Sequence, residues 1–254
     1  NLDIDSLSGK LKDKPKSMVS LMHGNNEIGN LLDIHRVGEI VKQHNAIFHS
    51  DTVQTMGHYA FDMQTLPVDF VVAGAHKFHG PKGVGFLYIN ANSKINPLIH
   101  GGAQERNMRG GTENIYGIIG LAKALEIANS NLESHKNHIR GLKERMKTLL
   151  QGKISGITFN GASGDIENSL YTVLNVSFPP HPDNEMLLFN LDIEGISCSG
   201  GSACSSGTNL GSHVLNALKV DPNRANVRFS FSKYTTEEEI DRTVAVLEGL
   251  FVSK

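Results

Sequence analysis

The chain has 254 residues, of which 39% are hydrophobic and 20% are charged, and its formal net charge is -2. This composition is ordinary for a globular protein of one or two domains, and it argues against a basic nucleic-acid-binding protein. No apolar run is long enough to cross a membrane, and the twelve histidines lack zinc spacing. We therefore expect no membrane span and no metal site.

The first half of the chain alternates apolar runs with helical patterns. After a weakly helical lead at residues 1–15, a buried strand is predicted at 17–22, and Asp33 is a good N-cap for a helix over 34–44. Three further strands are predicted at 46–49, 68–73 and 83–89. Short buried strands alternating with helices indicate an α/β fold with a mostly parallel sheet.

Polar residues follow three of these strands directly. Asn25 and Asn26 follow the first, Asp51 follows the second, and His76 and Lys77 follow the third. Ligands of parallel sheets bind beyond the carboxyl ends of the strands. We therefore expect the three polar groups to converge on one edge of the sheet.

The second half begins with a loop rich in Gly and Arg at 101–111 and a long helical stretch at 114–150, with a break near 129–131. A smaller α+β unit follows. Its predicted elements are strands at 174–178 and 226–230, a helix at 185–191 capped by Asp183, and a helix that starts within 235–239. We predict two domains, a large one at 1–130 and a small one at 131–254.

Lys77 is a candidate Schiff-base lysine. A lysine held at a strand end, off the surface, can have a lowered pKa and react with an aldehyde cofactor. Pyridoxal phosphate also needs an acidic partner for its pyridine nitrogen, and Asp51 fits that role. Gln54, one turn further on, fits the phenolic oxygen. On spacing alone, a surface lysine beside a turn remains the alternative.

The chain has two cysteines, which is too few for a disulfide framework and favours a reducing compartment such as the cytoplasm. Cys204 lies among Gly, Ser and Ala residues that favour an exposed loop, where a thiolate can act as a nucleophile. An incidental cysteine in a surface loop is the alternative. Cys198 ends an apolar stretch and is interpreted as a packed structural thiol.

Arginines provide two candidate anion sites. Arg228 lies in a strand with apolar neighbours, where its guanidinium can bind a carboxylate or form an internal salt bridge. Arg106, Arg109 and Thr112 stand in the Gly-rich loop, which is typical of a phosphate-binding, inter-subunit or simply solvated loop.

Five motifs occur here in the order found in cysteine desulfurases, which belong to the class V aminotransferases and to the fold-type I pyridoxal-phosphate enzymes. The motifs are Asn-Asn-Glu-Ile-Gly at 25–29, Ser-Asp-Thr-Val-Gln at 50–54, Ala-His-Lys-Phe-His-Gly-Pro-Lys-Gly-Val-Gly at 75–85, the Gly-rich run at 101–112, and Ser-Ala-Cys at 202–204. The resemblance covers about residues 18–250. It implies a three-layer α/β/α large domain, here incomplete, and a smaller C-terminal α+β domain.

The resemblance also implies a role for each matching residue in cofactor binding. Lys77 would form the Schiff base and later move the α-proton, with His76 holding it near the cofactor. Asp51 would pair with the pyridine nitrogen and Gln54 with the phenolic oxygen. Thr112 would reach across a homodimer interface to the partner's cofactor phosphate.

The remaining roles concern the substrate, L-cysteine. Asn26 would reach the cofactor oxygen and, together with Arg228, the substrate carboxylate. Cys204 would take the substrate sulfur as a persulfide, leaving L-alanine. The sulfur would pass to an acceptor protein, a scaffold or sulfur carrier, for iron-sulfur clusters or thiolated cofactors.

Two departures from the family pattern matter. The family often has Ser three residues before the lysine, where its hydroxyl binds phosphate, and this chain has Gly74. The family also runs to roughly 400 residues, so we expect about the N-terminal third to be missing here. Two alternative functions therefore remain: another class V aminotransferase or lyase that uses the same cofactor without sulfur transfer, or an inactive truncated fragment.

Overall fold

The computed structural model describes residues 3–14, 16–200 and 212–252, and the chain divides into two compact units. The first unit comprises residues 2–24 and 32–132. The second comprises residues 25–31 and 133–254, so the short segment that carries Asn26 belongs with the C-terminal half of the chain.

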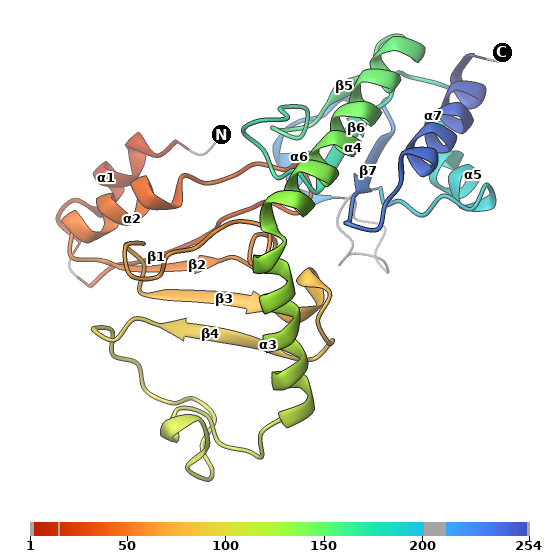
Figure 1. Cartoon of the computed structure of the whole chain (residues 1–254). Helices are drawn as coiled ribbons and strands as arrows, with labels where there is room; N and C mark the ends of the chain where they lie inside the picture. The colour runs from red at the N-terminus through yellow and green to blue at the C-terminus, as the bar shows by residue number, and fades with distance from the viewer. Residues whose placement is uncertain (1–2, 15, 201–211, 253–254) are drawn as a thin grey trace. The chain divides into compact units, whose positions relative to one another are not determined.

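A four-stranded sheet forms the centre of the first unit. Its strands lie in the order β1 (Met18–Met22), β2 (Ile47–Asp51), β3 (Phe70–Gly74) and β4 (Gly85–Ile89), as Figure 1 shows. β1, β2 and β3 run parallel, and β4 pairs antiparallel with β3. This confirms the prediction of a mostly parallel sheet.

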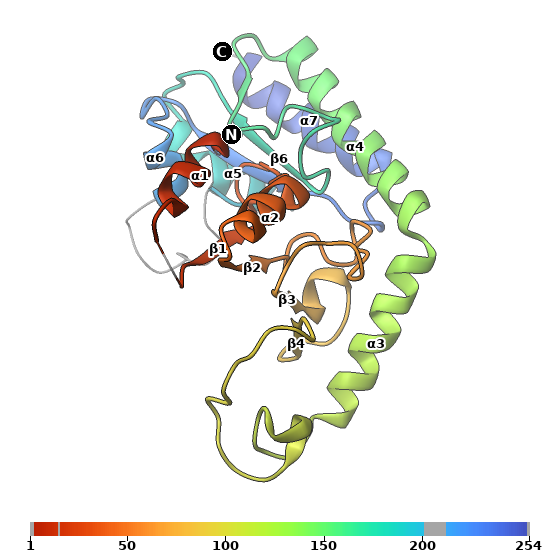
Figure 2. The ribbon, with the colours of Figure 1, turned by 90° about the vertical axis from the view of Figure 1, so that its left-hand side faces the viewer.

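One face of this sheet carries the core of the first unit. Helices α1 (Asp5–Leu11) and α2 (Ile34–Gln43) lie over the β1–β2 end (Figure 2), and α3 (Ile115–Ser130) contributes Ala128 to the same core. The predicted cap is confirmed, because Asp33 Oδ1 accepts a hydrogen bond from Arg36 N at 3.0 Å. The helix then buries Val37 and Val41 completely, each of which stabilises the unit by roughly 1.5–3 kcal/mol.

The opposite face of the sheet is open in the described part of the chain. Successive residues of a strand point to opposite faces, so the residues that alternate with Val19, Phe48 and Val71 point away from the core. Met18, Met22, Ile47 and Leu87 are exposed on this face, whereas Phe70 of β3, which points to the same side, is buried.

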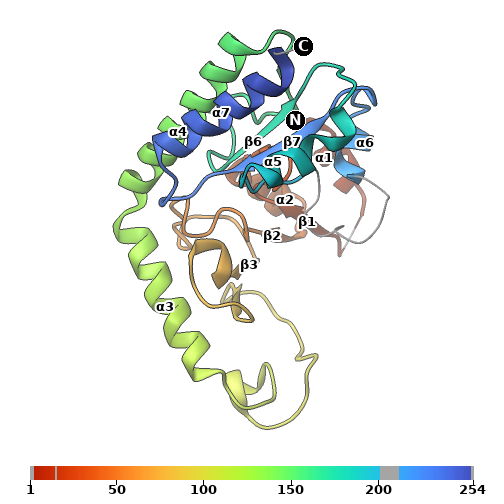
Figure 3. The ribbon, with the colours of Figure 1, turned by 90° about the vertical axis from the view of Figure 1, so that its right-hand side faces the viewer.

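The second unit contains an antiparallel sheet of β5 (Thr158–Phe159), β6 (Val173–Ser177) and β7 (Asn226–Ser230), and all five residues of β6 are buried. Helices α4 (Leu132–Lys153) and α7 (Glu237–Val252) lie side by side, as Figures 1 and 3 show. A bidentate contact joins them, from Arg145 to Asp241 at 2.8 and 2.7 Å. The described residues of the unit also form the shorter helices α5 (Leu187–Ile193) and α6 (His213–Ala217).

Most predicted helix ends are confirmed. α3 stops at Ser130, with Asn131 as its C-cap, so the predicted break is correct. Thr236 and Glu239 form a reciprocal capping box at the start of α7, with N···O distances of 2.9 and 3.2 Å. The prediction that Asp183 caps a helix is wrong: a 3-10 helix, η3 (Asn184–Met186), follows it, and its side chain makes no cap hydrogen bond. Among the helices of the described residues, none is long and apolar enough to span a membrane.

Candidate active site

Asp51 is the last residue of β2, and its side chain lies on the open face of the sheet. The register pairs it with Met22 of β1 and Val72 of β3, which share that face. The turn that follows is held in place, because Thr52 donates to Val72 O from both its backbone N and its Oγ1. Asp51 Oδ1 accepts from Val53 N at 2.9 Å. The carboxylate is thus presented at the C-terminal end of the parallel strands.

A buried histidine supports this turn from the neighbouring strand. His23 follows β1, and its backbone N donates to Asp51 O at 2.8 Å. Its Nδ1 shares a hydrogen bond with Thr55 Oγ1 at 2.9 Å. Burial, and secondarily the charge of His35, lowers the pKa of His23 to about 4. His23 is therefore neutral near pH 7 and acts on the turn through hydrogen bonds, without adding a positive charge.

His76 and Lys77 lie on a 3-10 helix, η1 (Ala75–Phe78), that continues directly from β3. With three residues per turn, Ala75 and Phe78 fall on one buried side, so His76 and Lys77 face outward and are exposed. The expectation that Lys77 is held off the surface is therefore wrong for the described chain. The backbone is nevertheless fixed, because Lys77 O and His58 Nε2 lie within hydrogen-bond distance, 3.1 Å.

Gly74 is the residue at the position where the family resemblance implies a serine. A Cβ built on Gly74 would lie 3.2 Å from Cε1 and 3.3 Å from Nδ1 of the His76 ring. Any side chain at this position would therefore force the imidazole to shift. Because His76 is exposed, a shift of this kind is open to its ring.

The other residues predicted for the cofactor lie in loops of the first unit. Gln54 is half-buried in the turn after Asp51. Thr112 is exposed two residues before Asn114, whose side chain caps α3 by accepting from Gly117 N at 3.1 Å. The first unit therefore brings Asp51, Gln54, His76 and Lys77 to the C-terminal ends of two neighbouring strands, which we call the strand-end edge.

The predicted substrate residues Asn26 and Arg228 lie in the second unit and are in contact. Arg228 is on β7, and its Nη1 donates to Asn26 O at 3.0 Å. Asn26 is part of a tight turn at residues 25–30, which we call the Asn26 turn. Asn25 Oδ1 accepts from Glu27 N and Ile28 N at 2.9 and 3.0 Å, which shapes the turn.

The second unit holds the Asn26 turn by hydrogen bonds from three directions. Asn175 Nδ2, on β6, donates to Glu27 O at 2.9 Å. Leu170 N donates to Gly29 O at 2.8 Å, and Ala162 N donates to Asn30 Oδ1 at 2.7 Å. The backbone around Asn26 is therefore positioned by buried polar contacts.

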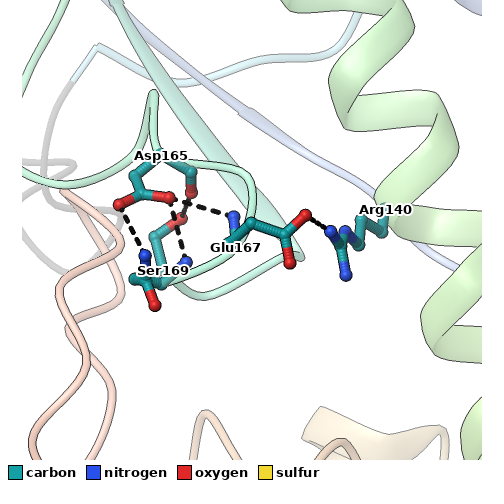
Figure 4. Close-up of polar contacts among 5 residues, drawn as sticks. Arg140, Asp165, Glu167 and Ser169 are labelled. Carbon is teal, nitrogen blue, oxygen red and sulfur yellow. Dashed lines mark hydrogen bonds and ion pairs between the residues drawn. The ribbon is translucent and has the colours of Figure 1, made fainter.

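The loop before Leu170 is itself braced (Figure 4). Asp165 Oδ1 accepts from the backbone N of Glu167, Ser169 Oγ donates to Asp165 O, and Glu167 pairs with Arg140 on α4. Lys143 Nζ donates to Ser169 Oγ at 2.6 Å, and burial lowers the pKa of this lysine to about 8. The loop therefore fixes the residue that supports Gly29.

The two cysteines differ in what the structure says of them. Cys204 lies outside the described residues. Cys198 is half-buried, and burial together with the nearby negative charge of Asp192 raises its pKa to about 11. The thiol of Cys198 is therefore protonated near pH 7 and is a poor nucleophile, as expected for a structural cysteine.

Sequence reasoning missed three supporting residues: His23, and the pair Glu27 and Ser212, in which Ser212 Oγ donates to Glu27 Oε2. Glu27 stands inside a motif that was singled out, but no role was assigned to it. Ser212 carried a readable signal, because a serine directly before an apolar helical pattern is a typical N-cap. His23 also follows a strand directly, which is the signal that singled out Asp51.

Comparison with known proteins identifies the family. The model of the class-V aminotransferases matches residues 1–243. The chain belongs to the class-V aminotransferase family. This family depends on pyridoxal phosphate, and the side chains of the strand-end edge suit it: a carboxylate, an amide, an imidazole and an amine in one unit.

Several relatives of the chain are named cysteine desulfurases. The chain is 42% identical over 251 residues to cysteine desulfurase IscS of Dictyoglomus turgidum, a match that covers 98% of this chain and 62% of the relative. Among solved structures, a NifS-like protein has a TM-score of 0.86 and 37% identity, covering 100% of this chain and 66% of that one. SspA in complex with cysteine has a TM-score of 0.69 and 29% identity, covering 92% of this chain and 64% of that one.

These matches confirm the predicted fold class, an incomplete α/β pyridoxal-phosphate transferase fold with a smaller α+β unit. The chain spans about three fifths of the length of the curated relatives it matches.

Proposed function

We propose that the chain is the larger part of a cysteine desulfurase, which converts L-cysteine to L-alanine and leaves the sulfur on Cys204. The names of the relatives and the cysteine complex of SspA support the substrate. The observation that carries the proposal is the strand-end edge. Lys77 follows β3 directly, and Asp51 ends the adjacent parallel strand on the open face.

The residues of this edge divide the work of holding the cofactor. Asp51 pairs with the pyridine nitrogen, Gln54 with the phenolic oxygen, and His76 helps to hold Lys77 near the reacting atoms. Pyridoxal phosphate, when bound, supplies an electron sink for the α-carbon of the substrate. Lys77 then removes the α-proton through its amine, and its exposure on η1 leaves that amine open to a ligand.

The second unit supplies the substrate contacts. Arg228 binds the carboxylate of cysteine, and Asn26, held beside it, orients the same group. Cys204 then attacks the substrate sulfur as a thiolate. An S–S bond forms as the C–S bond breaks, and the β-carbon keeps the bonding pair and takes up a proton. The products are L-alanine and a persulfide. The two sulfur atoms together lose two electrons, and the β-carbon gains them.

The assembly is proposed as a homodimer in the cytoplasm. The first half of α3 exposes Ile115, Tyr116 and Ile119, and such a patch is typical of a protein interface. Thr112 stands just before this helix and would reach the partner's cofactor phosphate. The acceptor would be a scaffold or sulfur-carrier protein that passes sulfur to iron-sulfur clusters or thiolated cofactors. A half-buried free thiol at Cys198 is consistent with a reducing compartment.

The second candidate is an inert fragment, and cofactor binding is the property that distinguishes it. Borohydride reduction separates the two. Purified protein given pyridoxal phosphate should turn yellow, and reduction should fix the cofactor on the peptide that contains Lys77, whereas Lys77→Ala should stay unlabelled. Absence of label on that peptide would favour the inert fragment.

Cysteine turnover separates desulfurase from a class V aminotransferase or lyase. Cys204→Ser should abolish release of alanine and sulfide from L-cysteine while cofactor labelling at Lys77 is retained. Full turnover by Cys204→Ser would show that sulfur does not pass through this residue.

A further inference from the structure

The described residues on both sides of segment 201–211, which includes Cys204, are hydrogen-bonded to the predicted substrate pair or its neighbour. On the N-terminal side, Ser199 forms an antiparallel bridge with Arg228. Ser199 N donates to Arg228 O at 3.2 Å, and Arg228 N donates to Ser199 O at 2.7 Å. The chain therefore enters this segment from the backbone of the arginine proposed to bind the substrate carboxylate.

On the C-terminal side, Ser212 is attached to Glu27, the residue next to Asn26. Ser212 Oγ donates to Glu27 Oε2. Ser212 is also the N-cap of α6, because its Oγ accepts from Leu215 N at 3.1 Å. Both side chains are buried, Glu27 at 2% exposure and Ser212 at 5%. A buried hydrogen bond to a carboxyl group is among the stronger polar contacts in proteins.

The two attachments are connected to each other through described residues. Arg228 Nη1 donates to Asn26 O, and Asn26 is covalently joined to Glu27. Starting from Ser199, the connection therefore passes through Arg228, Asn26 and Glu27 to Ser212. All five residues belong to the second unit.

We infer that Glu27 is a positioning residue for sulfur transfer, because its carboxyl group links the Asn26 turn to Ser212. This inference rests on the proposed desulfurase function. It assigns Glu27 no contact with substrate or cofactor. Its role is to keep the chain that leaves residue 211 in register with the residues that bind the substrate.

The hydrogen bonds of the Asn26 turn predict that removing the Glu27 side chain affects kcat more than KM. Asn175, Leu170 and Arg228 hold the backbone of the turn through Glu27 O, Gly29 O and Asn26 O, and a side-chain substitution leaves these oxygens in place. Substrate binding should therefore persist while the transfer step slows. Glu27→Ala should lower kcat about tenfold, the upper range expected for one lost buried hydrogen bond, with KM nearly unchanged.

The experiment uses the full protein with pyridoxal phosphate and measures kcat and KM for L-cysteine in a set of variants. Glu27→Gln keeps an acceptor oxygen, and Ser212→Thr keeps the hydroxyl, so both should restore most of the kcat lost in Glu27→Ala and Ser212→Ala. The double variant of Glu27→Ala and Ser212→Ala should lower kcat by less than the product of the two single effects. The matched control is Asp33→Ala, which removes the side-chain cap of α2 in the first unit and should leave both constants unchanged.

A second readout does not require turnover. Alkylation rates of Cys204 and Cys198 are compared by mass spectrometry in substrate-free protein, and Glu27→Ala should change the rate at Cys204 several-fold more than the rate at Cys198. If neither parent nor variant releases alanine but Cys204 responds in this way, the desulfurase proposal fails and the anchoring of the segment stands. Unchanged alkylation and kcat, a rise in KM alone, or equal effects of Asp33→Ala would overturn the inference.

Discussion

The strand-end edge of the first unit and the Asn26 turn of the second unit hold their functional side chains by different means. At the edge, exposed Asp51 and Lys77 are placed by strand register and one turn of 3-10 helix. At the turn, buried side chains such as Asn175 and Glu27 hold the backbone by hydrogen bonds. The difference predicts that changes at the edge alter chemistry and spare stability, whereas changes around the turn alter stability as well.

The largest effect expected is at the edge. Asp51→Asn keeps the shape of the side chain but removes the charge proposed to pair with the pyridine nitrogen. Loss of one member of an ion pair that the bound cofactor shields from water costs about 3–5 kcal/mol, so kcat/KM should fall by roughly two to four orders of magnitude. The free energy of unfolding should barely change, because Asp51 is exposed. Steady-state kinetics tests the fall in kcat/KM, and urea denaturation tests the free energy of unfolding. A large loss of stability would contradict the expectation that changes at the edge spare stability.

A buried group behind the edge should respond to pH. The pKa of His23 is lowered from 6.5 to about 4, so between these values the unfolded state binds the extra proton and stability rises with pH. The contribution is complete above about pH 6.5 and is lost as pH falls towards 4, by about 3 kcal/mol at most. Urea unfolding of the parent protein and of His23→Gln at several pH values measures this contribution of His23 to the free energy of unfolding. An identical pH dependence in the variant would rule it out.

In the second unit, Asn175→Ala should act mainly on stability. Asn175 is buried, donates to Glu27 O, and accepts from Asn160 Nδ2 at 2.8 Å. Truncation leaves Glu27 O without this donor, while Asn160 Nδ2 keeps its other bond, to Asn226 Oδ1, so the cost is about 1–3 kcal/mol in total. Urea denaturation should report this loss, and hydrogen exchange should locate faster opening at residues 25–30. Slower turnover with unchanged stability would remove the contrast between the two regions.

The smallest effect expected is at the N-terminal cap of α2. Asp33→Ala removes the acceptor for Arg36 N and should destabilise the first unit by about 1 kcal/mol. Because α2 lies on the covered face of the sheet, turnover should be unaffected. A loss of turnover in this variant would mean that stability and chemistry are not separable in the first unit.

The same contrast explains which parts of the structure could be predicted from sequence. Strand positions, the α2 cap and the break at Asn131 are local, and alternating apolar patterns and capping residues reveal them. The strand-end edge follows from these elements, because parallel strands finish on the same side. The exposure of Lys77 could not be predicted in this way. It depends on the 3-10 helix η1, which buries Ala75 and Phe78 and leaves the residues between them exposed.

The contacts around the Asn26 turn could not be predicted in the same way. Glu27 and Ser212 are 185 positions apart, and Asn175 and Glu27 are 148 apart. No local pattern in the sequence pairs such residues, because their contact depends on how β6, β7 and the turn pack. The assignment of residues 25–31 to the second unit is a long-range property for the same reason.

The central claim is that sulfur passes from cysteine to Cys204 in a protein that holds pyridoxal phosphate on Lys77. The most direct measurement is the mass of the Cys204 peptide after incubation of the cofactor-loaded protein with L-cysteine, with persulfides trapped by alkylation. We expect one added sulfur on this peptide, none on the Cys198 site, and none in Lys77→Ala. Alanine release with no added sulfur on Cys204, or added sulfur that persists in Lys77→Ala, would contradict it.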